Sequence, residues 1–107
     1  MTTFDNREQG FENKFAHDQE LDFKATARRN RQLGAWAAGL MGLEGQHVQD
    51  YANAVVKSEV DLPHDDDVLR KVAKDLSAAG LKVSEGEVMS KMDEFLAIAR
   101  EQLKAGE

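Results

Sequence analysis

Helix-ending signals constrain the fold of this chain more than any other feature. Gly42 and Gly80 each follow an apolar helical repeat, and each is followed by a leucine, Leu43 and Leu81. Glycine readily adopts the left-handed conformation found after many helices, and an apolar residue behind it packs back onto the last turn in a Schellman motif. The sequence therefore predicts several separate helices, two of which end at these glycines.

The sequence after residue 83 predicts a helix over about 85–104. Ser84 and Glu87 have the spacing of a capping box, and Val83 and Val88 have that of a hydrophobic staple. Apolar residues then recur at helical spacing: Val88, Met92, Phe95, Leu96, Ala99 and Leu103.

Two more helices are predicted between the glycines, over about 46–60 and 65–79. Gly45 is an acceptable cap for the first, and the approach to Pro63 ends it, because a residue before proline avoids the α conformation. The acids 65–67 suit the start of the second, where carboxylates accept free amide protons and face the positive end of the helix dipole. The apolar stripes are Val48, Tyr51, Ala52, Val55 and Val56, and then Val68, Val72 and Leu76.

The helix that leads to Gly42, predicted over about 19–41, is uneven. Its second half has an apolar face made by Leu33, Trp36, Ala37, Leu40 and Met41. Stepping back along that face meets Arg29, Thr26 and Asp22, which are poor candidates for burial. We expect only the second half to pack, and the first half to present the charges of Arg28, Arg29 and Arg31 to something else. A solvated helix face is the alternative.

Composition supports an all-α class. Together with the helix signals above, it predicts a four-helix bundle with a flexible amino-terminal segment. The 107 residues include one proline, no cysteine and no strand-like alternation of Val, Ile and Thr. Without cysteine there is no disulfide, thiolate zinc site or cysteine nucleophile, which fits a reducing compartment. No apolar run approaches the ~20 residues that cross a bilayer, and no signal sequence leads the chain. We therefore expect a cytoplasmic protein without direct membrane insertion.

Charge divides the chain into three zones. Residues 1–20 contain five acids and two bases, residues 21–41 contain one acid and four bases, and the remainder contains fourteen acids and eight bases. Nucleic-acid binding needs a clustered positive face, and the acidic body of this chain lacks one. The run from Arg28 to Arg31 is only four residues long and belongs to no recognisable recognition module, so it does not predict such binding.

Three of the five phenylalanines lie in the first fifteen residues. Phe4, Phe11 and Phe15 have spacings of seven and four, which place them on one face of a helix. Ordering about fifteen residues costs more backbone entropy than three buried rings return. We predict that residues 1–18 are disordered alone and become helical against a partner groove. The alternative is that Phe11 and Phe15 fold back onto the bundle of the same chain.

The rest of the sequence contains no recognised catalytic or metal-binding motif. His64 lies among acids at positions 61 and 65–67, but the spacing matches neither a zinc pattern nor an EF-hand loop, so helix capping is the preferred interpretation. His17 and His47 lack a second ligand at helical spacing. No phosphate-binding loop or nucleophile elbow is present. We therefore predict no enzyme activity, no catalytic residues and no metal site.

An ordered string of residues closely resembles the zeta-subunit family, small bacterial inhibitors of the F-type ATP synthase. The amino-terminal part of the resemblance consists of residues 4–8, 11–18, 23–25 and 27–30, which include Phe4, Phe11, Phe15 and Phe23. It continues through residues 33–34, 36–38, 42–43, 51–52, 55–56, 67–68, 70–72 and 91–94, and so covers nearly the whole chain.

The resemblance implies a four-helix body over residues 19–107 and an inhibitory segment over residues 1–18. This segment would insert into the catalytic head of the ATP synthase, fold between its subunits and block rotation in the hydrolytic direction. The partner would hold the protein at the cytoplasmic face of the inner membrane. Because the sequence has no long coiled-coil heptad seam, we expect the free protein to be a monomer. The partner-binding residues would be Phe4, Arg7, Glu8, Phe11, Glu12, Lys14 and Phe15.

The basic run supplies an alternative function. Arg28, Arg29 and Arg31 could form a secondary contact in a helical protein-interaction or nucleotide-sensing module, and the resemblance permits weak ATP or ADP binding there without a required cofactor. Three positions depart from the helix formers expected for the family, namely Gly10, Thr26 and Gly39. The fold prediction does not depend on these three residues.

Overall fold

The computed structural model describes residues 3–61 and 64–106, with side chains described from residue 19 onward. Four helices follow one another: α1 (Thr3–Leu40), α2 (Gln46–Asp61), α3 (Asp65–Ala78) and α4 (Glu85–Lys104). The all-α, four-helix class is therefore confirmed. The three predicted helices after Gly42 have bounds within one residue of those observed, and Pro63 lies outside the described residues.

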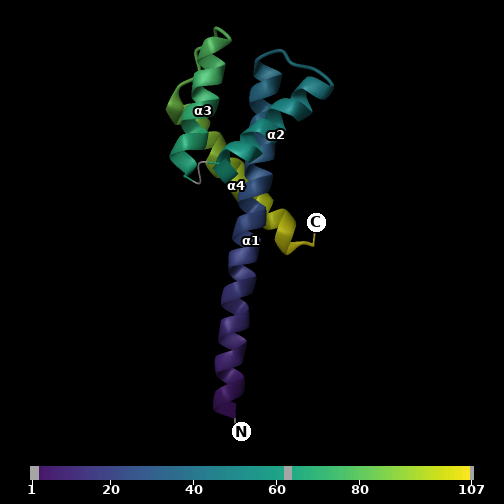
Figure 1. Ribbon diagram of the computed structural model, residues 1–107, viewed down its shortest axis with the longest axis vertical. Helices are drawn as coiled ribbons and strands as arrows, with labels where there is room; N and C mark the ends of the chain where they lie inside the picture. Colours follow the sequence, from purple (N-terminus) through teal and green to yellow (C-terminus); the bar gives the residue numbers. More distant parts are fainter. Residues whose placement is uncertain (1–2, 62–63, 107) are drawn as a thin grey trace.

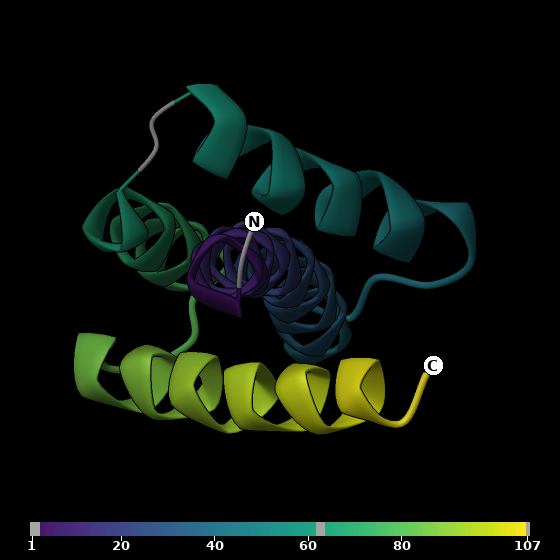
Figure 2. The same ribbon diagram turned by 90° about the horizontal axis from the view of Figure 1, so that it is seen from below.

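Helix α1 is the central element, with α2 and α4 on opposite sides and α3 beside it (Figure 2). It has 38 residues, a length of about 57 Å at 1.5 Å per residue. Its amino-terminal part extends beyond the other three helices, and the molecule measures 65 by 25 by 22 Å (Figure 1). The sequence predicts a start near residue 19, whereas α1 runs back to Thr3 without a break. The expected disorder of residues 1–18 in the free protein stays a prediction.

Both glycine-based helix ends are confirmed. Gly42 and Gly80 have φ of 80° and 82°. The amide of Leu43 donates to the Ala38 carbonyl at 2.9 Å, and the amide of Leu81 donates to the Leu76 carbonyl at 3.0 Å. These are the 6→1 hydrogen bonds that define two Schellman motifs.

The two predicted helix starts differ in how they are capped. Ser84 Oγ accepts a hydrogen bond from the Glu87 amide at 3.1 Å, so the predicted cap of α4 is present. The cap of α3 is His64, whose side chain makes no capping hydrogen bond, and Asp65 to Asp67 occupy the first turn. The acids therefore lie at the positive end of the helix dipole, and Asp65 accepts a hydrogen bond from another helix instead.

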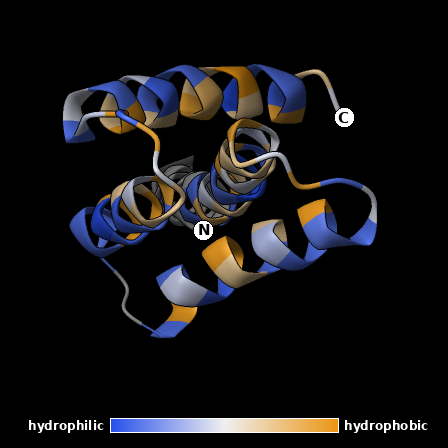
Figure 3. Cartoon of the chain, turned by 90° about the horizontal axis from the view of Figure 1, so that it is seen from above, coloured by the Kyte–Doolittle hydropathy of each residue, from blue (hydrophilic) through white to orange (hydrophobic). Residues whose placement is uncertain are grey.

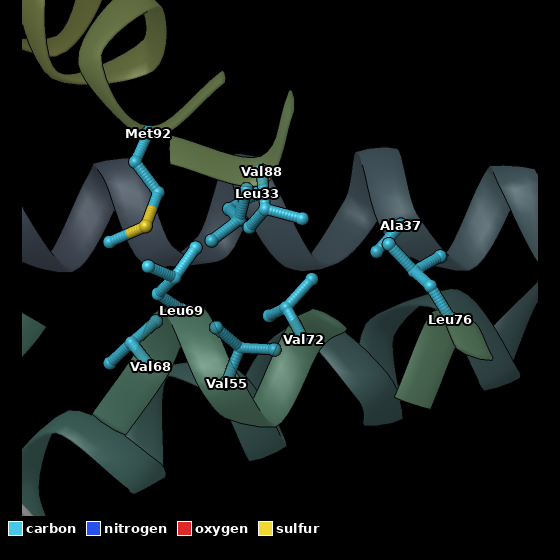
Figure 4. Close-up of a cluster of buried hydrophobic side chains, with 9 residues drawn as sticks. All are labelled: Leu33, Ala37, Val55, Val68, Leu69, Val72, Leu76, Val88 and Met92. Carbon is cyan, nitrogen blue, oxygen red and sulfur yellow. The ribbon is translucent and has the colours of Figure 1, made fainter. Parts of the chain in front are cut away.

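The core lies where α2, α3 and α4 converge on the carboxyl-terminal half of α1 (Figure 4). Leu40 was predicted on the apolar face of α1 but is 43% exposed. Around α2 and α4, hydrophobic and hydrophilic residues alternate as expected for amphipathic helices (Figure 3). The central cluster is Leu33, Ala37, Val55, Val68, Leu69, Val72, Leu76, Val88 and Met92.

Small residues allow α1 and α2 to approach closely. A Cβ atom added to Gly34 would lie 2.6 Å from the Cα of Ala52 and 3.2 Å from a methyl group of Val55. Only glycine fits at this crossing without moving a backbone. By contrast, nothing lies within 4 Å of a Cβ added to Gly39, on the exposed side of the same helix.

A polar contact joins α2 to α3. The Tyr51 hydroxyl donates to Asp75 Oδ2 at 2.8 Å, and Lys71 Nζ donates to the same oxygen at 3.1 Å. Burial is the main cause that raises the pKa of Tyr51 above its ordinary value, and the hydrogen bond and charge of Asp75 add to it. The phenol is therefore a fixed donor in this pair of helices.

Across the described part of the chain, no helix is both long and apolar enough to cross a membrane.

Candidate partner-binding surfaces of the first helix

All of the predicted partner-binding residues belong to α1. The first set lies in the part of the helix that extends past the bundle in Figure 1, where the backbone is helical but the side chains are outside the described residues. The set comprises Phe4, Arg7, Glu8, Phe11, Glu12, Lys14 and Phe15. Their partner-binding role stays a prediction.

The second set, the basic run from Arg28 to Arg31, includes one arginine that faces into the bundle. Arg29 is 3% exposed. Its Nη2 donates to Asp65 Oδ1 at 2.8 Å and lies 3.9 Å from Glu59 Oε1, while its Nε donates to Asn30 Oδ1 at 3.1 Å. One guanidinium thus connects α1 to the end of α2 and the start of α3.

The two carboxylates beside Arg29 have pKa values that move in opposite directions. The hydrogen bond from Arg29 lowers the pKa of Asp65, because it favours the ionised form. Burial raises the pKa of Glu59, and hydrogen bonding with Asp65 adds to the effect. The two carboxylates thus lie beside one cation, which favours the ionised form at Asp65, while burial disfavours it at Glu59.

The other two arginines of the run point elsewhere. Arg28 Nη1 donates to Gln102 Oε1 on α4 at 3.2 Å, and Arg31 Nη1 donates to Asn53 Oδ1 on α2 at 3.2 Å. The contact of Arg31 is exposed and that of Arg28 is partly buried. The structure therefore distributes the run around the helix and does not gather the three cations on one face. Weak nucleotide binding by these residues stays a prediction.

The expectation that only the second half of this helix packs is wrong. Ala25 and Asn30 have no exposed surface, and Arg29 is almost completely buried. Burial of the guanidinium is tolerated because carboxylates from two other helices compensate its charge. Asp65 also accepts a hydrogen bond from it. The signal in the sequence was the four-residue spacing of Ala25, Arg29 and Leu33, which continues the apolar face through a charged residue.

The histidine and acid cluster forms no metal centre within residues 19–61 and 64–106, where no group of three or more possible ligands is arranged around a common point. Asp65 of this cluster instead pairs with Arg29.

Comparisons with known proteins identify a matching family and a similar solved structure. The family model described as ATPase inhibitor subunit zeta matches residues 1–102. A solution NMR structure is 37% identical to the chain, covers 81% of it and 99% of its own length, and superposes with a TM-score of 0.69. No functionally curated protein matches the sequence. Because the family model spans the extended part of α1 as well as the bundle, the chain belongs to the ATPase inhibitor subunit zeta family.

Proposed function

We propose that this chain inhibits ATP hydrolysis by the F-type ATP synthase, and that residues 1–18 do so by inserting at an interface of its catalytic head. Membership of an ATPase inhibitor family supports an ATPase as the target. The observation that carries the proposal is the extent of α1. Its backbone continues from the core past the other helices, so a partner can surround this part without disturbing the bundle (Figure 1).

The proposed segment combines apolar anchors with charges that set the register. Rings spaced i, i+7 and i+11 suit an amphipathic helix lying in a groove, and buried aromatic anchors dominate interfaces of this kind. Charged side chains beside them fix the orientation and exclude wrong partners. The residues proposed for these roles are Phe4, Arg7, Glu8, Phe11, Glu12, Lys14 and Phe15.

Folding of the segment inside the catalytic head would explain why hydrolysis is inhibited and synthesis is not. A segment that becomes helical inside the catalytic head, close to the rotor, obstructs rotation in the hydrolytic direction, and rotation during synthesis expels it. The bundle, about 25 by 22 Å across, stays outside and holds the end of the helix. In this proposal the free protein is a monomer without enzyme activity, and it reaches the cytoplasmic face of the inner membrane only through the ATP synthase.

The test is ATP hydrolysis by the purified catalytic head, titrated with the full chain and with Phe11→Ala and Phe15→Ala. Loss of a buried aromatic anchor costs about 2 kcal/mol or more, so each variant is expected to need roughly 30-fold more protein for half inhibition. Ile98→Ala on α4 is the control, because Ile98 is 39% exposed and far along the chain from the segment. Unchanged inhibition by both phenylalanine variants would contradict the proposal.

The alternative, a module that works through the surface of Arg28 to Arg31, predicts the reverse result. Charge removal at Arg28 and Arg31 would abolish binding, and the phenylalanine variants would retain it. The burial of Arg29 speaks against this alternative, since one of its three cations is already neutralised inside the bundle.

A further inference from the structure

Two exposed apolar side chains flank one hollow in the surface of the bundle. Phe23 on α1 and Val60 on α2 are 73% and 71% exposed, more than any other large hydrophobic residue in the part of the chain with described side chains. The hollow between them has a volume of about 520 Å³, in the range of ligand-sized pockets. Its lining includes Asp22, Phe23, Thr26, Asn30, Glu59 and Val60.

The residues at the inner side of this hollow include a buried amide with an unused donor. Asn30 Oδ1 accepts from Arg29 Nε at 3.1 Å, which fixes the orientation of the amide. Its Nδ2 has no acceptor among the described residues, and Glu59 Oε2 is likewise unpaired there. Buried polar groups normally have partners, so these two atoms leave hydrogen-bonding capacity unsatisfied beneath the hollow.

Two residues that line the hollow share the helical register of the three phenylalanine positions proposed for inhibition. Phe4, Phe11, Phe15, Asp22 and Thr26 follow one another at intervals of seven, four, seven and four residues, which keeps one face of a continuous helix. Asp22 and Thr26 line the hollow. At 1.5 Å per residue, Asp22 lies about 10 Å along the helix from Phe15.

We propose that this hollow is a second docking site for the ATPase, filled by a large apolar side chain of the catalytic head beside the point where the inhibitory segment enters. The inference rests on the proposed function, because insertion of residues 1–18 brings this face of α1 against the ATPase. The continuity of the helix face favours this occupant over a second copy of the chain.

The test uses charge substitutions at the two flanking residues in the full chain. Phe23→Glu, Val60→Glu and their double variant are titrated against ATP hydrolysis by the catalytic head. Met89→Glu and Ile98→Glu are matched controls, because they are exposed apolar residues of α4 at 48% and 39%. Half-inhibitory concentrations are expected to rise roughly tenfold for each single variant and up to about 100-fold for the double one. The controls should stay within about threefold.

The outcomes separate this inference from the function it rests on. Failure of the unaltered chain to inhibit removes the proposed function, and the hollow loses its stated occupant. Normal inhibition by the double variant, with the unaltered chain also active, overturns the docking site alone. A dimer in sedimentation that the double variant dissociates, without a change in inhibition, assigns the hollow to a second copy and also overturns the inference. Circular dichroism verifies folding, and Phe23→Leu should retain potency if an apolar contact is what matters.

Discussion

Two stretches of α1 pack into the same bundle by different means. Between Leu33 and Ala38 the contacts are apolar and close, with Gly34 allowing the helix to approach α2. Between Ala25 and Asn30 the contacts depend on a buried guanidinium that joins two carboxylates. We call these the apolar stretch (residues 33–38) and the polar stretch (residues 25–30).

The difference shows how one helix can serve as both core and connector. The apolar stretch gains its stability from removal of side chains from water, which does not depend on pH. The polar stretch depends on the ionisation of partners at the end of α2 and the start of α3. Substitutions should therefore cost most in the apolar stretch, and a dependence on pH should arise in the polar stretch.

The largest effect is expected from Leu33→Ala. Leu33 has no exposed surface and belongs to the central cluster, so truncation removes buried methyl groups and leaves a cavity. The free energy of unfolding should fall by about 2–5 kcal/mol, measured by urea denaturation. Leu40→Ala is the matched control on the same helix, because Leu40 is 43% exposed and its loss should cost under about 1 kcal/mol. Equal losses for the two leucines would contradict the observed core.

The next effect comes from a pair of glycines. Gly34→Ala places a Cβ 2.6 Å from the Ala52 Cα, so the two helices must separate, at a cost of about 1–3 kcal/mol. Gly39→Ala meets no atom within 4 Å and should stabilise the helix by roughly 0.5–1 kcal/mol. Thermal unfolding followed by circular dichroism compares them. Stabilisation by both substitutions would disprove the close contact.

A smaller effect is expected for Arg29→Met, which tests the polar stretch. Removal of the guanidinium leaves Asn30 Oδ1 without its donor and Asp65 without its ion pair. Since the Asp65 side chain is 62% exposed and water can hydrate it, the expected loss is about 1–2 kcal/mol in urea denaturation. Arg31→Met removes only an exposed contact with Asn53 and should change stability by less than about 0.5 kcal/mol. No difference between the two variants would count against a structural role for Arg29.

The smallest effect is a change in the pH dependence of stability. The pKa of Glu59 is raised in the folded protein, so its contribution is complete below the ordinary pKa of about 4.3 and is lost as the pH rises through the raised value. Glu59→Gln should therefore flatten the decline in unfolding free energy above about pH 4.

The lowered pKa of Asp65 has the opposite effect on the pH dependence of stability. Stability is lost as the pH falls, so Asp65→Asn should flatten the decline in unfolding free energy on the acid side. Urea denaturation from pH 3 to 8 measures both slopes, and a Glu59→Gln profile that runs parallel to that of the unaltered chain would contradict this assignment.

Local signals were sufficient for most of the fold. The glycine and leucine pairs at 42–43 and 80–81 and the Ser84 cap determine helix ends within a few residues, and the structure contains each of them. The burial of Arg29 could not be predicted in this way. Its partners are 30 and 36 residues away in sequence, and only the arrangement of three helices brings Glu59 and Asp65 to it. The hollow beside Phe23 was missed for the same reason, since its two sides come from α1 and α2.

The predicted inhibitory residues came from spacing and resemblance. Phe4, Phe11 and Phe15 have too few apolar neighbours in their own segment to form a core, which is why their pattern indicates a partner. The proposed partner is inferred from the family, because the sequence of one protein does not specify the surface of a second protein.

The most direct test of the central claim is ATP hydrolysis by the purified catalytic head, titrated with the full chain and with residues 19–107 alone. The contacts that fold the bundle lie after residue 18, and the segment proposed to block hydrolysis lies before it. The hollow beside Phe23 adds binding to the ATPase but does not itself block hydrolysis. The shortened chain should therefore retain helical circular dichroism and a cooperative thermal transition, yet fail to inhibit, whereas the full chain inhibits. Inhibition of equal potency by residues 19–107 would contradict the account.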